Sequence, residues 1–305
     1  MYQPHTSATE HVVWRVDREG MTMRTQMLGR ISIDRSRVQD ELELGRDFHY
    51  AEQYPEFQSG QPWKTCMIWS CGGEVGDGVI AHYDTSLPAQ PTVYGKQLPY
   101  LRRLIEESVV VEHLRFARLV VMTDAVLLPH RDFLEFTDKP TAARAAHRLH
   151  VPLTTDETCL FMEDGTVYRM FPGELWSLDV SRMHSAAVLS DIRRVHLIMD
   201  FADLPDHALL RIERNPVQGI PEPNLVHRPK LTDEQRTAIR ALAGVVDLEN
   251  LNEVFGIVIR KSYRADGGER FAWDAMSEIA RDAEDPAVGA RIEELYKVCA
   301  LERNE

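Results

Sequence analysis

The chain contains a short histidine–carboxylate motif, His130-Arg131-Asp132, and a further histidine, His184, later in the sequence. Two imidazoles and one carboxylate on one side of an octahedron hold non-haem Fe(II) and leave the other coordination positions open. The spacing suits this chemistry because side chains at i and i+2 of a strand share a face, so His130 and Asp132 can point at one metal ion. By itself, the short motif is also compatible with a turn-capping aspartate and a surface histidine.

An arginine, Arg194, follows His184 ten residues later and begins an alternating apolar segment. On a strand, Arg194, His196 and Ile198 would share one face. A buried guanidinium is costly unless it is paired, and a ligand carboxylate can pair with it bidentately. Beside the metal motif, Arg194 therefore predicts a dicarboxylate co-substrate, 2-oxoglutarate, and an oxygenase that uses Fe(II) and O2. A structural ion pair for Arg194 and a neutral, hydrogen-bonded core histidine at His196 are the alternatives.

The bulk composition is that of an ordinary globular protein of 305 residues, long enough for one core plus a small second domain. The formal net charge of -13 argues against nucleic acid and anionic membrane surfaces as partners. No apolar run approaches the roughly 20 residues that span a bilayer, and the start of the chain does not resemble a secretory signal. Four cysteines, none in a zinc-type spacing, predict reduced thiols and a cytoplasmic protein.

The elements that must position these residues fall into three predicted parts: an N-terminal extension (1–22), a β-rich domain (23–214) and a C-terminal α-helical domain (215–305). In the middle part, short apolar runs alternate with Asp-Gly and Pro-Gly turns, which indicates an antiparallel barrel or sandwich. The expected strands are 28–33, 63–70, 114–121, 125–128, 148–153, 167–171, 175–178 and 195–201. A hairpin after the strand at 175–178 would return His184 to the mouth of the same barrel.

Helical patterns occupy both flanks of the β-rich part. Two helices are expected at 38–48 and 100–111, before most of the strands. After a proline-containing linker, Thr232-Asp233-Glu234-Gln235 matches a capping box that opens a helix ending near Gly244. Amphipathic helices at 250–263, 271–283 and 287–301 follow. This tail contains no ligand-type cluster, so we expect it to buttress the β core or to form a homodimer contact.

Taken together, these passages resemble the bacterial free-proline hydroxylases, and among them the L-proline 3-hydroxylase type of the wider aspartyl/asparaginyl β-hydroxylase group. The similarity runs from about residue 23 to about residue 294. No counterpart matches the N-terminal extension, and the segment between Phe133 and Arg148 diverges. The matching passages are Met27-Leu28-Gly29-Arg30-Ile31, Pro88-Ala89-Gln90-Pro91-Thr92, Leu98-Pro99-Tyr100-Leu101, Pro129-His130-Arg131-Asp132-Phe133, Pro172-Gly173-Glu174 with Trp176 and Asp179, His184-Ser185-Ala186, Asp200-Phe201 and the tail from Thr232.

The resemblance implies a fold that is mainly β with α: a double-stranded β-helix core of the jelly-roll or cupin-like type, plus a C-terminal helical domain. It implies that Fe(II) binds to the residues of the metal motif and to His184, and that Arg194 takes the distal carboxylate of 2-oxoglutarate. His150, in an Arg-Leu-His passage, inherits a role in holding the co-substrate. Arg118 and Arg148 become candidates for binding the carboxylate of an amino-acid substrate.

The function expected from these features is hydroxylation of a free cyclic imino acid, L-proline or L-pipecolate, at C3 or C4. Asp132 favours hydroxylation because a related halogenase needs that ligand position free for chloride. One alternative is a peptide β-hydroxylase of aspartyl or asparaginyl residues, although the group's peptide enzymes lack the carboxylate ligand. A cupin-like binding module without turnover is a second alternative. A zinc hydrolase is a third, since two histidines and an aspartate also suit zinc, but it leaves Arg194 without a task.

Overall fold

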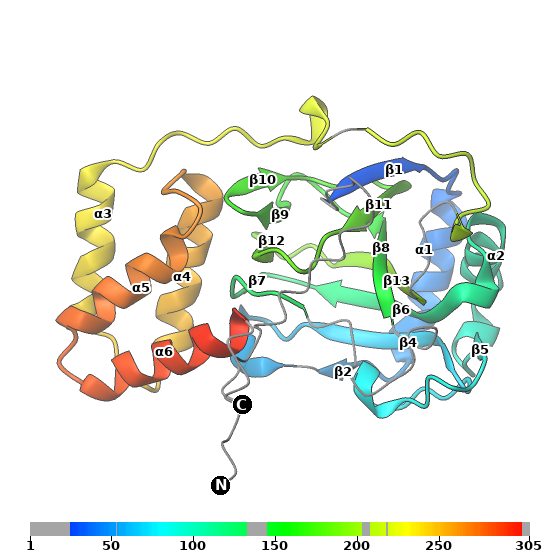
Figure 1. The fold of residues 1–305 in the computed structure, drawn as a ribbon, viewed down its shortest axis with the longest axis horizontal. Coiled ribbons are helices and arrows are strands. Elements are labelled where there is room, and N and C mark those ends of the chain that lie inside the picture. The colour runs from blue at the N-terminus through cyan, green and yellow to red at the C-terminus, as the bar shows by residue number, and fades with distance from the viewer. Residues whose placement is uncertain (1–24, 53, 133–144, 203–207, 218, 301–305) are drawn as a thin grey trace, which may run out of the picture.

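The architecture is two antiparallel β-sheets that face each other, with helices on their outer sides (Figure 1). The structure, a computed structural model, describes residues 25–300 except 53, 133–144, 203–207 and 218. The predicted extension at 1–22 lies outside the described residues, as does most of the divergent segment that begins at Phe133. The described part is mainly β with α, as predicted.

The larger sheet carries the residues of the Arg-Leu-His passage and of the Arg194 segment. Its strand order is β1-β11-β8-β13-β6-β4-β2, and β5 pairs with β4. The strands are β1 (Gln26–Arg30), β2 (Ala51–Glu52), β4 (Lys64–Cys71), β5 (Ala89–Pro91), β6 (Leu114–Met122), β8 (Ala145–Thr154), β11 (Glu174–Leu178) and β13 (Arg194–Ala202). β6 and β13 are buried along nearly their whole length, as is expected of strands in the middle of a sheet that is covered on both faces.

The smaller sheet carries His184 and leads into the metal motif. Its strand order is β10-β9-β12-β7-β3. The strands are β3 (Gln58–Gly60), β7 (Ala125–Leu127), β9 (Cys159–Glu163), β10 (Thr166–Tyr168) and β12 (His184–Val188). The two facing antiparallel sheets, with strands that mostly alternate between them along the chain, form the double-stranded β-helix that the family resemblance implied.

Three of the four hydrophobic clusters in the described part of the chain join these layers. One fills the space between the sheets and includes Phe161, Tyr168 and Trp176. A second lies between the outer face of the larger sheet and the helices α1 (Arg35–Leu44) and α2 (Pro99–Ser108). The third joins the outer face of the smaller sheet to the C-terminal helices. The smaller sheet is therefore buried on both faces, and the C-terminal helices belong to its core.

The C-terminal helices are α3 (Asp233–Arg240), α4 (Leu251–Arg264), α5 (Phe271–Asp282) and α6 (Pro286–Cys299). Thr232 caps α3 in the predicted capping box, and a short 3-10 turn extends the helix to Gly244. Helix α4 approaches β3 so closely at Gly256 that an added Cβ would collide with the Ser59 side chain. Glycine permits this close packing of a helix on a strand edge.

The connection between β13 and α3 runs along the outside of both sheets (Figure 1). Its backbone donates hydrogen bonds to β1, from Val217 to Met27 O at 3.0 Å, and to β10, from Val226 to Val167 O at 2.9 Å. Both strands are edge strands of their sheets, so the connection covers two edges that would otherwise be open to pairing with other chains. The domain boundary near residue 214 stays a prediction.

The path from β11 to His184 differs from the predicted hairpin. β11 belongs to the larger sheet and β12 to the smaller one, so the residues between them cross from one sheet to the other. His184 reaches the metal motif because β12 pairs with β9 and β7. β9 was missed because its five residues, Cys159–Glu163, show no clear alternation; four of them are buried.

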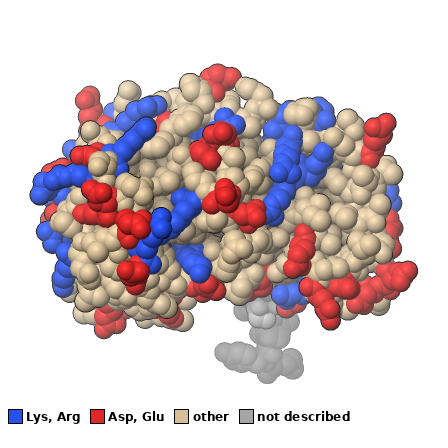
Figure 2. All heavy atoms as spheres, turned by 180° about the vertical axis from the view of Figure 1, so that it is seen from behind, with Lys and Arg blue, Asp and Glu red and all other residues tan. Residues whose placement is uncertain are grey.

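Further predictions concern the cysteines, membrane-spanning helices and the charged surface. All four cysteines are buried and free, as predicted. None of the described helices is long and apolar enough to cross a membrane. On the face shown in Figure 2, acidic and basic side chains are interspersed over both the barrel and the helices.

Candidate active site

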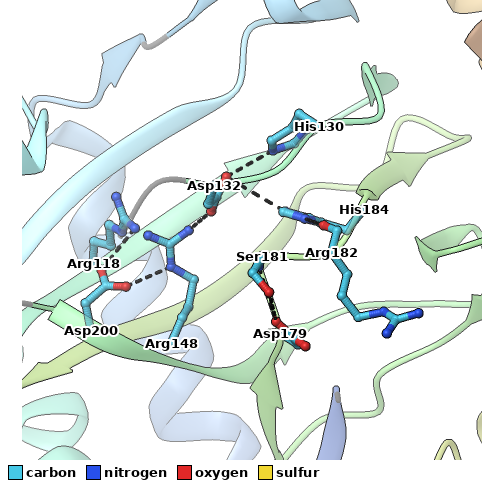
Figure 3. Close-up of polar contacts among 9 residues, drawn as sticks. All are labelled: Arg118, His130, Asp132, Arg148, Asp179, Ser181, Arg182, His184 and Asp200. Atoms are coloured by element: carbon cyan, nitrogen blue, oxygen red, sulfur yellow. Dashed lines mark hydrogen bonds and ion pairs between the residues drawn. The ribbon is translucent and has the colours of Figure 1, made fainter. Parts of the chain in front are cut away.

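The metal motif and His184 converge at one end of the space between the sheets (Figure 3). His130 Nε2 lies 3.2 Å from Asp132 Oδ1, and His184 Nε2 lies 3.8 Å from the same oxygen. One ligand atom from each of the three residues lies within 4.8 Å of the other two. All three side chains are partly exposed, so a metal ion and small ligands can reach them.

Backbone contacts orient both imidazoles for metal binding. His130 Nδ1 lies 2.6 Å from Leu128 O, and His184 Nδ1 lies 3.0 Å from Arg182 O. Because a carbonyl oxygen only accepts hydrogen bonds, each Nδ1 carries a proton, and each Nε2 is the ring nitrogen that is left to bind a metal. Two Nε2 atoms and a carboxylate are a donor set that suits Fe(II), so the residues present fit this metal.

The electrostatics of the group favour a charged carboxylate beside a neutral imidazole. Burial opposes ionisation of Asp132, but the Arg148 guanidinium and the two histidines hold the pKa of its carboxyl well below the usual range. Burial and the neighbouring His130 lower the pKa of His184 to about 4. Metal binding needs a carboxylate and unprotonated imidazoles, so Asp132 and His184 are poised in the required states near neutral pH.

The two arginines predicted to contact substrate form a charged network next to the triad. Arg118 donates from a terminal nitrogen to Asp200 Oδ2 at 3.0 Å, and Arg148 donates from Nε to Asp200 Oδ1 at 2.7 Å. Arg148 also donates to Asp132. Figure 3 shows this chain of contacts from Arg118 through Asp200 and Arg148 to Asp132. Arg118, Arg148 and Asp200 are buried, and the two guanidiniums balance the charges of the two carboxylates.

A second polar group lies in the same interior and contains Arg194, His150 and His196. The strand register puts Arg194 and His196 on the inner face of β13 and His150 on the inner face of β8. The His150 and His196 rings are 5.8 Å apart, and the Arg194 guanidinium lies over the Phe161 ring at 5.0 Å. All three polar side chains are buried.

These three side chains share an unusual lack of partners. Two nitrogens of Arg194 and all four ring nitrogens of His150 and His196 are buried without a hydrogen bond to any described residue. Burial lowers the pKa of Arg194 to about 10, and no carboxylate contributes to that shift. Burial and nearby arginines also hold the pKa of both histidines well below the usual range. Buried polar atoms normally have partners. The group formed by Arg194, His150 and His196, called the well below, therefore has the properties of a site for an anionic ligand.

This geometry decides between alternatives that the sequence left open. Within the part of the chain that the structure describes, Arg194 forms no ion pair, and neither ring nitrogen of His196 forms a hydrogen bond. The sequence reasoning missed Asp200, although its position two residues beyond Ile198 puts it on the same strand face. It also missed Phe161, because β9 was not predicted.

Comparisons with known proteins identify the family to which the chain belongs. A model of the family described as aspartyl/asparaginyl beta-hydroxylase matches residues 30–203, and one described as L-proline 3-hydroxylase, C-terminal, matches residues 207–305. L-proline cis-3-hydroxylase 1 of Streptomyces sp is 32% identical over 292 residues, which cover 88% of this chain and 96% of the relative. L-proline cis-4-hydroxylase of Rhizobium meliloti (strain 1021) is 31% identical over 288 residues, covering 92% and 95%.

Solved structures show a more distant likeness. A Pseudomonas putida prolyl-4-hydroxylase aligns with 13% identity and a TM-score of 0.36, covering 60% of this chain and 95% of that one. The assignment rests instead on the sequence matches, which span most of the chain. The chain belongs to the aspartyl/asparaginyl β-hydroxylase family, and most of its length aligns with L-proline hydroxylases.

Proposed function

We propose that the protein is an Fe(II)- and 2-oxoglutarate-dependent dioxygenase that hydroxylates a free cyclic imino acid, L-proline or L-pipecolate, at C3 or C4. One observation carries the proposal: the triad and Arg194, a buried arginine with unpartnered nitrogens, both lie in the barrel interior. L-Proline is the first substrate to test, because the similar relatives are named as L-proline cis-3- and cis-4-hydroxylases. Pipecolate differs from proline by one ring carbon, and it remains the second candidate.

His130, Asp132 and His184 hold the iron in this proposal. Their three donor atoms are a set that suits Fe(II) and would leave other coordination positions for the co-substrate and O2. When bound, the iron would let O2 oxidise both molecules: 2-oxoglutarate would be converted to succinate, which takes up one oxygen atom, and CO2, and the other oxygen atom would enter the substrate C–H bond as a hydroxyl group. The contacts of His130 and His184 with backbone carbonyls fix the ring orientation and keep each Nε2 free to bind metal.

Arg194 binds the distal carboxylate of 2-oxoglutarate, and His150 helps to hold the co-substrate. A guanidinium without a protein partner is suited to this task because a carboxylate can satisfy two of its N–H groups at once. His196 lies beside both residues and has two unpartnered ring nitrogens, so we add it to the wall of this pocket. The low pKa of both histidines keeps them neutral, so each ring offers one N–H donor.

Arg118 and Arg148 bind the carboxylate of the amino-acid substrate. Asp200 holds both guanidiniums at the triad, and Arg118 Nε has no hydrogen-bond partner among the described residues. Their N–H groups can therefore position a small carboxylate next to the metal, which orients the ring C–H for attack. The partner of the site is thus a small molecule. A cytoplasmic location, which four free cysteines favour, and a homodimer are further proposals.

The peptide β-hydroxylase and the binding module are the two rival functions. Both are tested by incubating the protein with Fe(II), 2-oxoglutarate and either free proline, pipecolate, linear amino acids or aspartyl peptides. We expect succinate to form with proline or pipecolate, and mass spectrometry to find one added oxygen on the ring. Hydroxylated peptide without hydroxylated amino acid would favour the peptide enzyme. No oxygen uptake with any substrate would favour the binding module.

The same assay tests the triad. His130→Ala, Asp132→Ala and His184→Ala should each abolish substrate-dependent succinate formation, because each removes one of the three donor atoms with which this chain would hold the metal. The His113→Ala variant is the matched control, since this histidine lies in a short turn before β6, outside the site. Full turnover by any purified triad variant would refute the assignment of that ligand.

A further inference from the structure

The segment that carries the metal motif has two backbone edges, and only one of them pairs with a strand. On the first edge, His130 and His184 exchange backbone hydrogen bonds of 2.9 and 2.8 Å, and Asp132 N donates to Val180 O at 2.8 Å. These bonds fix the first edge against β12 and the residues before it. In extended chain, the residues between, Pro129 and Arg131, direct their backbone groups to the opposite edge.

The second edge is satisfied by the C-terminal helices. On that side, β7 pairs with β3. The last backbone hydrogen bond of this pairing is donated by Leu128 N–H to Phe57 O at 2.9 Å. Beyond that point Trp273 Nε1 of α5 donates to Pro129 O at 3.1 Å. Arg131 N donates to Cys299 O, at the end of α6, at 2.8 Å. The last carbonyls of a helix have no partner within the helix, and here one of them binds the backbone between His130 and Asp132.

A third helix reaches the strand that carries His184. Tyr263 of α4 and Ser185, the residue after His184, are joined by a hydrogen bond of 3.0 Å between their hydroxyls. Ser185 in turn donates to Leu127 O at 2.7 Å. Both Tyr263 and Ser185 are buried. The contact therefore links β12 to β7 directly beside the proposed ligand.

Aromatic side chains from the three helices surround Trp273. The Trp273 ring packs edge-on against Phe255 of α4 at 4.8 Å and Tyr296 of α6 at 5.2 Å. Trp273 itself is only 4% exposed. Each of α4, α5 and α6 thus contributes to one aromatic cluster, and each also hydrogen-bonds a residue adjacent to a proposed ligand. A single packed unit therefore forms a hydrogen bond with a chain neighbour of each proposed ligand.

We propose that the C-terminal helices act in place of a strand on the metal-bearing edge, and that Trp273 and Tyr263 are positioning residues for His130, Asp132 and His184. This inference rests on the proposed function for the metal itself. Groups that orient metal ligands typically change metal affinity by about 10–100-fold when they are lost. A helical domain whose only role was stability would leave metal affinity unchanged in any variant that still folds.

The test measures Mn(II) binding to the metal-free protein by electron paramagnetic resonance, together with the thermal midpoint of the same samples. Trp273→Phe and Tyr263→Phe keep an aromatic ring and remove the hydrogen-bond donor. We expect each to weaken Mn(II) binding by about tenfold. The matched control is Asp124→Asn, which removes the ion pair of 2.9 Å between the β6–β7 turn and Arg260 of α4. This contact also joins the helices to the barrel but lies away from the ligands, and it should leave Mn(II) affinity within about twofold.

The outcomes separate the inference from the proposed function. If the parent protein binds Mn(II), His184→Ala does not, and both aromatic variants bind it as tightly as the parent, the positioning role is wrong while the triad stands. If His184→Ala also binds Mn(II) normally, the triad assignment fails first. Equal losses of affinity in Asp124→Asn and in the aromatic variants would reduce the effect to general stability and overturn the inference.

Discussion

Two regions of the barrel interior treat buried charge in opposite ways. Next to the triad, Arg118, Arg148, Asp132 and Asp200 form a network in which each guanidinium has a carboxylate. On the same sheet, the well formed by Arg194, His150 and His196 has unpartnered nitrogens on every side chain. Both regions are lined by β8 and β13, so their surroundings are similar and the difference lies in the residues themselves.

The difference separates charges that are balanced within the folded chain from a charge that has no counter-charge among the described residues. A buried ion pair that loses one partner leaves an uncompensated charge, which is strongly destabilising. A buried charge without any partner is already costly in the free protein, and it gains most when an anion binds. The network is therefore assembled on folding, whereas the well would be completed by the proposed co-substrate. Three substitutions can break or sharpen this contrast.

The largest effect is expected for Asp200→Asn in the network. The substitution keeps the side-chain shape but removes the charge that Arg118 and Arg148 share. Loss of one partner from a buried pair costs about 3–5 kcal/mol, so the free energy of unfolding in urea should fall by that order. The surface control, Asp124→Asn, should cost no more than about 1 kcal/mol. Similar losses in both variants would show that Asp200 does not balance the buried arginines.

Arg194→Met should separate binding from stability in the well. The variant removes the proposed anchor for 2-oxoglutarate, so affinity for the co-substrate should fall by about 100-fold or more. The metal-free variant should unfold at the same urea concentration as the parent or a higher one, because an unpartnered charge has been replaced by an apolar chain. Thermal shift with Mn(II), with and without 2-oxoglutarate, measures the first effect. A loss of stability like that of Asp200→Asn would mean that Arg194 has a structural partner.

The smallest effect concerns the pH dependence of stability. Burial, followed by the charges of Arg194 and His150, lowers the pKa of His196 well below the usual range. Below a pH of about 6.5, the unfolded chain therefore binds a proton at His196 that the folded chain does not. Stability then falls as pH falls, by up to about 1.4 kcal/mol per pH unit for each such histidine.

His196→Leu should reduce that slope without abolishing it, since the pKa of His150 is lowered in the same sense. Urea unfolding at pH 7.5 and pH 5.5 measures the change, and the two proteins should differ more at the lower pH. An identical slope in parent and variant would show that His196 is hydrogen-bonded or protonated in the folded state.

Much of the fold was readable from local patterns. The strands at 114–122 and 194–202 and the helices at 251–264 and 271–282 lie within two residues of their predicted bounds. Their periodicity is strong because each element buries one face or both. The capping box at Thr232 also predicted the start of α3 correctly. β9 was not readable, since a short, nearly fully buried strand carries no alternation.

By itself, the sequence determined the donor set of the proposed metal site and the face on which Arg194 and His196 lie, because residue type and a period of two are local properties. Only the tertiary structure decided what each charge meets. Pairing across β13 brought Asp200 to Arg118 and Arg148 and left Arg194 alone. Packing of the C-terminal helices on the smaller sheet brought α5 and α6 to the backbone edge beside His130, where Trp273 and the end of α6 bind the backbone in place of a strand. Contacts between segments so distant in sequence depend on how the sheets and helices pack, which no local pattern records.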